Sequence, residues 1–300
     1  HQLGSVFPAR GAWSENSPGQ RYAATLPRHV EDAAARAAGL VTPVGVRSAQ
    51  AALGIGYNRR VATPNGVQHC WNPQEQAELR PGPAADVTCT VLSLEQTVGR
   101  RRYLLWSVGA HPTVLGKTSR LVSADYPGLA CHAIQQDDSD TRAMFLLGAA
   151  GDVHPWIATQ EDPAGAHRVA ETAASFVTLL SHALRPGAGP AAETLQITTR
   201  TVTIGKGELD LAAWNIGGTL LLASPTELFS ELSTELRRHV GRPMICVTCA
   251  NGWTGYWPTR EAFEQGSYEI DAARHWGRNP GDSEKLVDEL VDLAGEVSGS

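Results

Sequence analysis

Apolar residues recur at helical spacing in several segments of the chain. In the first of these segments Leu26, Val30 and Ala34 fall on one face, and Glu31 lies on the polar side. Between 164 and 184 the apolar residues are mostly alanines at the same spacing. This periodicity predicts helices over 18–40, 164–184, 227–239 and 283–297.

Shorter runs are either continuously apolar or alternate between apolar and polar residues, as strands do. They predict strands over 41–53, 86–95, 102–108, 143–147, 194–204, 209–214, 219–222 and 244–249. The second and third runs are joined by Gln-Thr-Val-Gly-Arg, a length typical of a hairpin. Strands and helices are mixed throughout, and no segment repeats at a fixed period.

The order of elements favours an α/β (α+β) fold, a layered sandwich with β-sheets covered by helices. The only linker-like stretch, 185–192, is too short to separate domains, so we expect a single domain over 1–300. Every apolar run is broken well before the roughly 18 residues that a bilayer span needs, which predicts a soluble chain without a transmembrane segment.

Charge and cysteine content narrow the classes further. The net charge is -6 and the 25 Lys and Arg residues are scattered, which argues against nucleic-acid binding. Five cysteines are too few, and odd in number, for a disulfide framework. The chain opens on His1, and we expect it to be part of a longer protein whose targeting signal lies upstream.

Reactive side chains stand where apolar strands end, which is where active sites of layered α/β folds usually lie. His111 follows the strand over 102–108 and is either a zinc ligand or a histidine satisfied by nearby backbone. Asp152 and His154 follow the strand over 143–147. Asp152 either orients His154 or caps a tight turn.

Two further segments carry candidates of the same kind. Glu227 is predicted in the first turn of a helix, where the helix dipole favours a carboxylate with or without a metal. Tyr256 and Tyr268 flank a predicted short helix; a phenol can ligate zinc or donate to an oxyanion, and simple aromatic packing is the alternative. Cys246 and Cys249 form a CxxC without a second pair, so we interpret them as core thiols.

Taken in this order, the segments resemble those of the neutral, non-lysosomal ceramidase family. Ala110-His111-Pro-Thr113 and Leu121-Val-Ser-Ala-Asp125-Tyr-Pro-Gly128 are similar to that family's strand-end histidine and acidic turn. Leu222-Ala-Ser-Pro225-Thr-Glu227-Leu-Phe resembles its Leu-Gly-x-Pro-x-Glu-Phe pattern. The run from Asn251 to Tyr268 reproduces the spacing of its tyrosine motif.

The resemblance implies a zinc ion (Zn²⁺) bound at strand ends by His111, Glu227 and Tyr256. The remaining histidine ligand of the family belongs to a Thr-His-Thr-His-Ser-Gly-Pro motif, and His1 is the candidate for its last histidine. The strand before His1 and the family's C-terminal β-sandwich are expected to lie outside this chain. A zinc-bound water would then attack an N-acyl amide carbonyl.

The resemblance also implies the residues around the metal. Arg59, in Tyr57-Asn58-Arg59, is similar to an Asn-Arg-Ser loop whose arginine helps to hold the substrate. Tyr268 would contact the substrate carbonyl or the transition state. The family has a serine central to ceramide hydrolysis where this chain has His154. His154 would carry the proton, with a pKa suited to neutral pH, and Asp152 would orient it.

These expectations describe a zinc-dependent amidohydrolase acting on ceramide or a related lipid or small-molecule amide. Contact with a membrane surface is compatible with such a substrate, and the resemblance leans toward a secreted protein. Two alternatives stay open. One is a lipid- or glycan-binding relative without catalysis, and the other is a hydrolase of the same scaffold acting on a non-sphingoid amide or ester.

Overall fold

The computed structural model describes residues 18–184 and 195–298, and the chain divides into two compact units. The first unit comprises His1–Pro43 and Gln96–Gly99. In its described part, α1 spans Pro18–Ala38, which confirms the helix predicted over 18–40. The Thr97 amide donates to the Pro43 carbonyl at 3.1 Å, which joins the two pieces of this unit. The second unit, Val44–Glu95 and Arg100–Ser300, carries the other elements.

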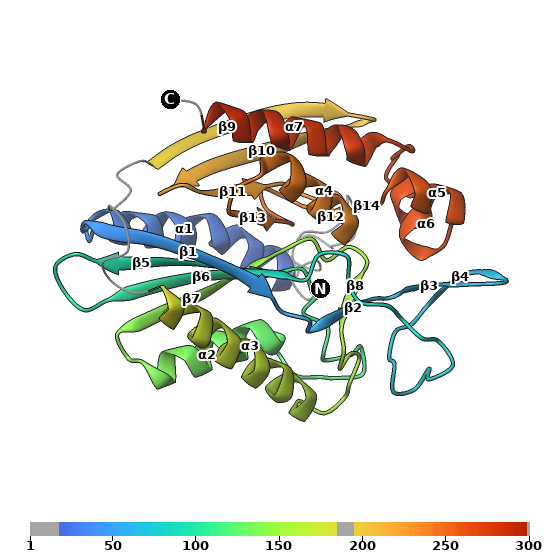
Figure 1. Cartoon of the computed structure of the whole chain (residues 1–300), viewed down its shortest axis with the longest axis horizontal. Coiled ribbons are helices and arrows are strands. Elements are labelled where there is room, and N and C mark those ends of the chain that lie inside the picture. The colour runs from blue at the N-terminus through green and yellow to red at the C-terminus, as the bar shows by residue number, and fades with distance from the viewer. Residues whose placement is uncertain (1–17, 185–194, 299–300) are drawn as a thin grey trace. The chain divides into compact units, whose positions relative to one another are not determined.

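The first sheet of the second unit has the strand order β1-β5-β6-β7. Its strands are β1 Val44–Ala52, β5 Thr88–Gln96, β6 Arg102–Val108 and β7 Thr141–Leu147. Strands β5 and β6 form the predicted antiparallel hairpin, and β6 runs parallel to β7. The connecting helix α2, Asp125–Asp137, packs against α3, Ala164–Ala183, and both contact this sheet (Figure 1).

The second sheet has the order β13-β11-β10-β9. Its strands are β9 Leu195–Ile204, β10 Gly207–Ile216, β11 Thr219–Ala223 and β13 Met244–Val247. The first three are antiparallel, and β11 runs parallel to β13 through α4, Ser230–Val240. Helix α7, Asp282–Glu296, packs on α4 and on this sheet (Figure 1).

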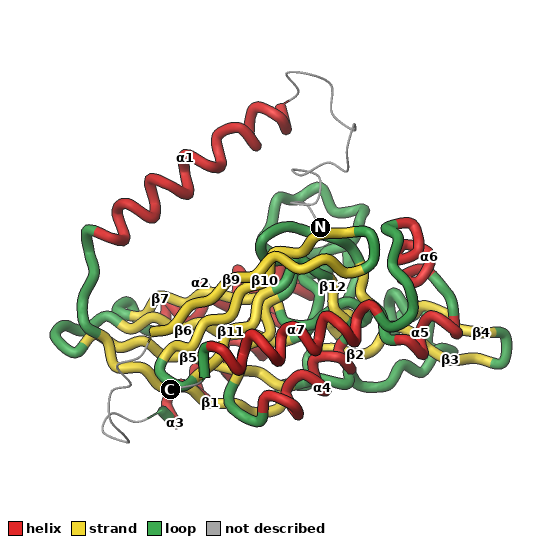
Figure 2. The backbone as a smooth tube through the Cα atoms, turned by 90° about the horizontal axis from the view of Figure 1, so that it is seen from above, coloured by secondary structure: helices red, strands yellow, loops and turns green. Residues whose placement is uncertain are grey.

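Hydrophobic burial explains why the two sheets lie face to face. Leu220 and Leu222 of β11 point into a core shared with α4 and α7, whereas Leu221 packs with Leu92 and Ile245 between the sheets. A strand buried on both faces is continuously apolar, as β11 is in sequence. The strands of both sheets run in broadly similar directions (Figure 2), as in aligned sheet packing. The predicted layered α/β sandwich is confirmed.

Small elements extend beyond the carboxyl ends of several strands. They are the pairs β2 Gly56–Asn58 with β8 Val153–Pro155, β3 Arg60–Thr63 with β4 Gly66–His69, and β12 Glu227–Leu228 with β14 Tyr256–Trp257, and the helices α5 Arg260–Gln265 and α6 Tyr268–His275. Of these, only α5 was predicted, as the short helix between the two tyrosines. No helix in the described ranges is long and apolar enough to cross a membrane.

The position of Glu227 differs from the prediction. It lies in β12, and helix α4 begins only at Ser230. The backbone amide of Glu227 donates to the Gly255 carbonyl at 2.8 Å, and that of Phe229 donates to the Trp257 carbonyl at 3.2 Å. This pairing keeps residues 227–229 extended, so the helix dipole does not explain the carboxylate. The interpretation of Cys249 as a core thiol is also wrong, because it is exposed.

Candidate active site

Two of the predicted metal ligands are direct neighbours in a β-ladder. Glu227 and Tyr256 are paired in register between β12 and β14, which run parallel. Paired residues of adjacent strands project their side chains to the same face. Both side chains are buried. The short ladder therefore brings together a carboxylate and a phenol that lie 29 positions apart in the sequence.

His111 contacts the Glu227 carboxylate of this pair. It follows β6, is buried, and places Nε2 at 3.0 Å from Oε2 of Glu227. On the other side of the ring, Nδ1 lies 3.0 Å from the Val153 carbonyl, which can only accept a hydrogen bond. Nδ1 therefore carries a proton, and Nε2 faces the carboxylate either as the second N–H of an imidazolium or as the lone pair of a neutral ring. In the second case a cation must lie between Nε2 and the carboxylate oxygen.

Imidazole nitrogen and carboxylate oxygen are donor types that zinc takes. The 3.0 Å between His111 Nε2 and Glu227 Oε2 is shorter than the roughly 3.3–3.6 Å that separates two ligand atoms about 2.0–2.2 Å from a tetrahedral zinc, so the two side chains would move slightly apart around an ion. In the described ranges no three His, Cys, Asp or Glu side chains are grouped to hold a metal, so the described site supplies two such ligands and the Tyr256 phenol. His1, the fourth predicted ligand, lies outside the described residues.

Electrostatics distinguish the two side chains of the ladder. Burial acts to raise the pKa of Glu227, but hydrogen bonds from His111 and Trp253 and the Arg59 charge outweigh it and lower the pKa. The carboxyl group is therefore ionised near neutral pH. Burial and the adjacent Glu227 charge raise the pKa of Tyr256 instead. Its phenol stays protonated unless a cation is bound beside it.

His154 lies on the neighbouring ladder. In β8 it pairs with Tyr57 of β2, and its ring centre is 6.0 Å from that of His111. Burial, with the charges of Arg59 and His111, lowers the pKa of His154 to about 2, well below the neutral range expected from sequence. Its Nδ1 is buried and, within the described residues, has no hydrogen-bond partner.

Asp152 is held by groups other than His154. Its Oδ1 accepts from the Ser230 amide at 2.8 Å, and Oδ2 accepts from Asn58 Nδ2 at 2.7 Å and the Ser230 hydroxyl at 3.2 Å. Its carboxylate thus joins the start of α4 to the β2 strand, an arrangement that neither sequence-based alternative described. Burial raises the pKa of Asp152 despite these hydrogen bonds.

Arg59 reaches the site through a buried ion-pair network. Its side chain is 1% exposed, donates from Nε to Glu269 Oε1 at 2.7 Å and from Nη2 to the Gly151 carbonyl at 2.7 Å, and lies 5.5 Å from the Tyr256 ring centre. Glu269 is fully buried and also contacts Arg60 at 2.9 Å and His69 at 2.6 Å. The network ties α6 to the segment that begins at β2.

Sequence reasoning missed most of this network. Glu269 directly follows the predicted Tyr268, and Arg60 directly follows the predicted Arg59. Their position beside predicted site residues was the only signal in the sequence that could have identified them. Tyr268 itself is 51% exposed, with its ring centre 5.7 Å from that of Tyr256. Four of the eight predicted site residues, His111, Glu227, Tyr256 and Arg59, are linked by these contacts into one cluster.

Replacing Glu269 with glutamine is expected to lower the free energy of unfolding by about 3–5 kcal/mol at pH 7, because two buried guanidinium groups lose their counter-charge. His69 and Arg59 outweigh the effect of burial and hold the pKa of Glu269 far below its usual range. Its stabilisation is therefore present above the unfolded pKa of about 4.3 and is lost as the pH falls through the folded value.

Urea denaturation at pH 7 and pH 4 measures this effect. Glu289→Gln, which removes the half-exposed partner of Arg200, is the control and should cost less than about 1 kcal/mol. The difference between wild type and Glu269→Gln should shrink at pH 4. Equal stability of the two proteins at pH 7 would contradict the prediction.

Partly exposed aromatic side chains surround the cluster, and we call them the aromatic rim: Trp71, Trp156, Trp253, Tyr268 and Trp276. The Trp71 ring centre lies 5.5 Å from that of His154 and 5.7 Å from that of Tyr268. Trp156 packs on Tyr57, and Trp253 packs on Trp276. An apolar ligand could therefore contact ring faces next to the buried polar groups.

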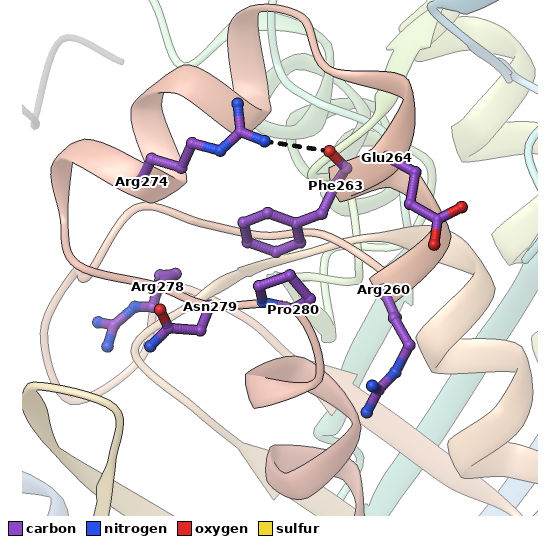
Figure 3. A pocket seen from close by; sticks show the side chains of 7 residues that line it. All are labelled: Arg260, Phe263, Glu264, Arg274, Arg278, Asn279 and Pro280. Carbon is purple, nitrogen blue, oxygen red and sulfur yellow. Dashed lines mark hydrogen bonds between the residues drawn. The ribbon is translucent and has the colours of Figure 1, made fainter.

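A separate cavity of about 310 Å³ is lined by α5, α6 and the turn after α6 (Figure 3). Arg274 donates to the Phe263 carbonyl, and the Arg278 guanidinium stacks on Trp257 at 4.2 Å. The heads of Arg260, Arg274 and Arg278 point in different directions (Figure 3). The lining presents no converging set of charges and includes none of the residues of the cluster.

Comparison with known proteins adds a likeness of fold. No family model and no curated protein matches the sequence. The structure is similar to that of neutral ceramidase from Pseudomonas aeruginosa, with 16% identity and a TM-score of 0.69 over 89% of this chain. It is also similar to a structure described as ceramidase complexed with C2, with 15% identity and a TM-score of 0.69 over 86% of this chain. The chain spans about half the length of these proteins, 54% of each.

Proposed function

We propose that this chain carries the catalytic part of a zinc-dependent hydrolase of the neutral ceramidase type, which cleaves an N-acyl amide bond. One observation carries the proposal: His111 Nε2 lies 3.0 Å from Glu227 Oε2, beside the Tyr256 phenol, while Nδ1 faces the Val153 carbonyl. An imidazole nitrogen, a carboxylate and a phenol brought together in this way are donors that zinc can bind. The likeness to ceramidase structures supports the proposal through the shared fold.

His111, Glu227 and Tyr256 would hold the ion, with His1 as the fourth candidate. Zinc bound by such a set supplies Lewis acidity and lowers the pKa of a water molecule. The Val153 carbonyl orients His111 by accepting the proton of Nδ1. In a neutral ring this contact places the proton on Nδ1, so that Nε2 would be the metal-binding nitrogen.

The remaining groups act on the substrate. Arg59 keeps its positive charge because the contacts with Tyr256 and Glu269 outweigh the effect of burial on its pKa, so we assign it to stabilise negative charge developing on the amide oxygen. Tyr268 donates its hydroxyl to the same oxygen from the exposed side. We assign proton transfer to His154, whose buried Nδ1 has no hydrogen-bond partner within the described residues. With its pKa lowered to about 2 the ring is neutral at pH 7, so it would take the proton of the attacking water and pass that same proton to the leaving amine.

The aromatic rim supports an amide with an apolar acyl or amine portion, such as ceramide or another lipid amide. Rings with a polar tip and an apolar face, such as Trp71 and Tyr268, suit a ligand that is apolar at one end and wet at the other. The neutral ceramidase family, which this chain resembles, has a serine at the position of His154. Substrates other than ceramide are therefore tested as well.

Chelation is expected to abolish hydrolysis of N-acyl substrates, and added zinc is expected to restore it. The purified full chain is assayed by mass spectrometry for metal content and, with and without chelator, against ceramides, other N-acyl amides and esters of matched chain length. Stoichiometric zinc with chelator-sensitive amide cleavage supports the proposal. Lipid binding without turnover would favour the non-catalytic relative, and cleavage of esters alone would favour a different hydrolase.

A further inference from the structure

The two oxygens of the Glu227 carboxylate face different partners. Oε2 lies 3.0 Å from His111 Nε2, on the side assigned to the metal. Oε1 accepts a hydrogen bond from the indole N–H of Trp253 at 2.7 Å. Indole nitrogen is a donor only, so this contact has one chemical direction. A hydrogen bond to an ionised acceptor is short and strong, which agrees with the distance.

Backbone hydrogen bonds fix the position of Trp253 relative to Glu227. Residues 249–255 are joined to the turn before Glu227 by four hydrogen bonds: Cys249 N to Thr226 O at 3.1 Å, Ala250 N to Ser224 O at 3.0 Å, and Thr254 N and Oγ1 to Pro225 O at 2.7 and 2.8 Å. Both Gly252 and Gly255 have positive φ, which allows the tight path between these contacts. Trp253 is thus carried on a segment that cannot shift independently of Glu227.

The side chain of Trp276 packs against the Trp253 indole. The ring centres of Trp253 and Trp276 are 5.3 Å apart in an edge-to-face arrangement with an interplanar angle of 83°. Trp276 also lies against Gly255, where an added Cβ would stand 3.1 Å from its Cδ1. Of the two rings, only Trp253 bonds the carboxylate, although both are partly exposed.

We infer that Trp253 is a positioning residue that makes Glu227 a one-oxygen ligand by occupying Oε1 and leaving Oε2 for the metal. A free carboxylate can bind a metal ion through one oxygen or through two, and it can rotate between these modes. The hydrogen bond from the indole to Oε1 favours binding through Oε2 alone, and it is already formed before an ion binds. Groups that orient a metal ligand in this way commonly change metal affinity by 10- to 100-fold when they are replaced. This inference rests on the proposed zinc site.

The test compares Trp253→Phe with Trp276→Phe in the full chain. Both changes keep an aromatic ring at a partly exposed position, but only the first removes the hydrogen bond to Oε1. Zinc affinity is measured by competition with a chromogenic chelator, and the visible spectrum of the Co²⁺-substituted protein reports ligand geometry. We expect roughly 10- to 100-fold weaker zinc binding and an altered Co²⁺ spectrum for Trp253→Phe. Trp276→Phe keeps both the Trp253 N–H and an aromatic ring packed against it, so its zinc affinity should stay within about twofold of wild type.

Trp253→His supplies a rescue, because a ring N–H donor returns to the same position and should recover part of the affinity. It also serves if Trp253→Phe fails to fold, which circular dichroism would show. Wild-type affinity and an unchanged Co²⁺ spectrum in Trp253→Phe would overturn the inference while leaving the zinc site intact. A wild-type chain that binds no zinc would remove the proposed function, and this inference with it.

Discussion

Replacing His111 with alanine is expected to remove zinc binding and to lower amide hydrolysis by about a thousandfold or more. The substitution deletes the nitrogen that faces Glu227 Oε2, and with it one of the described ligands. A Lewis-acid metal contributes several kcal/mol to the reaction barrier, and each 1.36 kcal/mol is a factor of ten in rate. Metal content and kcat/KM measured on the same preparation check both parts of this prediction.

Two other histidine substitutions sharpen the test of His111. His132 is exposed on α2, and its replacement by alanine should change neither zinc content nor rate. His154→Ala should keep zinc and lose turnover, since His154 is assigned to proton transfer. If His111→Ala retains stoichiometric zinc, the tautomer argument and the metal site built on it are wrong.

Replacing Gly151 with alanine is expected to impair the site from a position that carries no chemistry. A Cβ at Gly151 would lie 2.5 Å from the Glu227 carbonyl oxygen and 2.8 Å from that of Leu228. These are backbone atoms, so β12 must move. The Gly151 amide also donates to the Leu228 carbonyl at 2.8 Å, which resists that movement. We expect a loss of about 1–3 kcal/mol in stability, as for overpacked cores, together with weaker zinc binding.

Gly54→Ala is the matched control for Gly151→Ala. Nothing lies within 4 Å of a Cβ built at Gly54, so this variant should match wild type in thermal midpoint and zinc affinity. The comparison isolates the contact with β12 from the general effect of removing a glycine. Unaltered zinc affinity in Gly151→Ala would mean that the position of Glu227 does not depend on this crossing of two backbones.

The long elements could be predicted from the sequence because their apolar periodicity is strong. Helix α3 and the hairpin of β5 and β6 are examples, and the structure confirms both. Helix α2 was missed, since Pro127 and Gly128 near its start suggest a turn; proline is in fact tolerated in a first helical turn. Strand β12 was missed because two residues carry no periodicity, and its conformation depends on β14, a partner far along the chain.

In the candidate site, too, some residues could be predicted from the sequence and others could not. The order of segments along the chain sufficed to choose His111, Glu227 and Tyr256, because each stands beside a motif of its own. Trp253 and Glu269 act through contacts between segments, and Glu269 meets Arg59 across 210 positions. Such contacts leave no local pattern in a single sequence. The low pKa of His154 was likewise unforeseen, because burial depends on the packed fold.

The contact between His111 and Glu227 joins residues 116 positions apart, which has a consequence for the stability of the fold. His111 follows a strand of the first sheet, and Glu227 follows a strand of the second. Any proteolytic cut between the two sheets leaves His111 on one fragment and Glu227 on the other. A divalent ion bound by both residues would stabilise the packing of the two sheets, and its removal would lower the free energy needed to separate them.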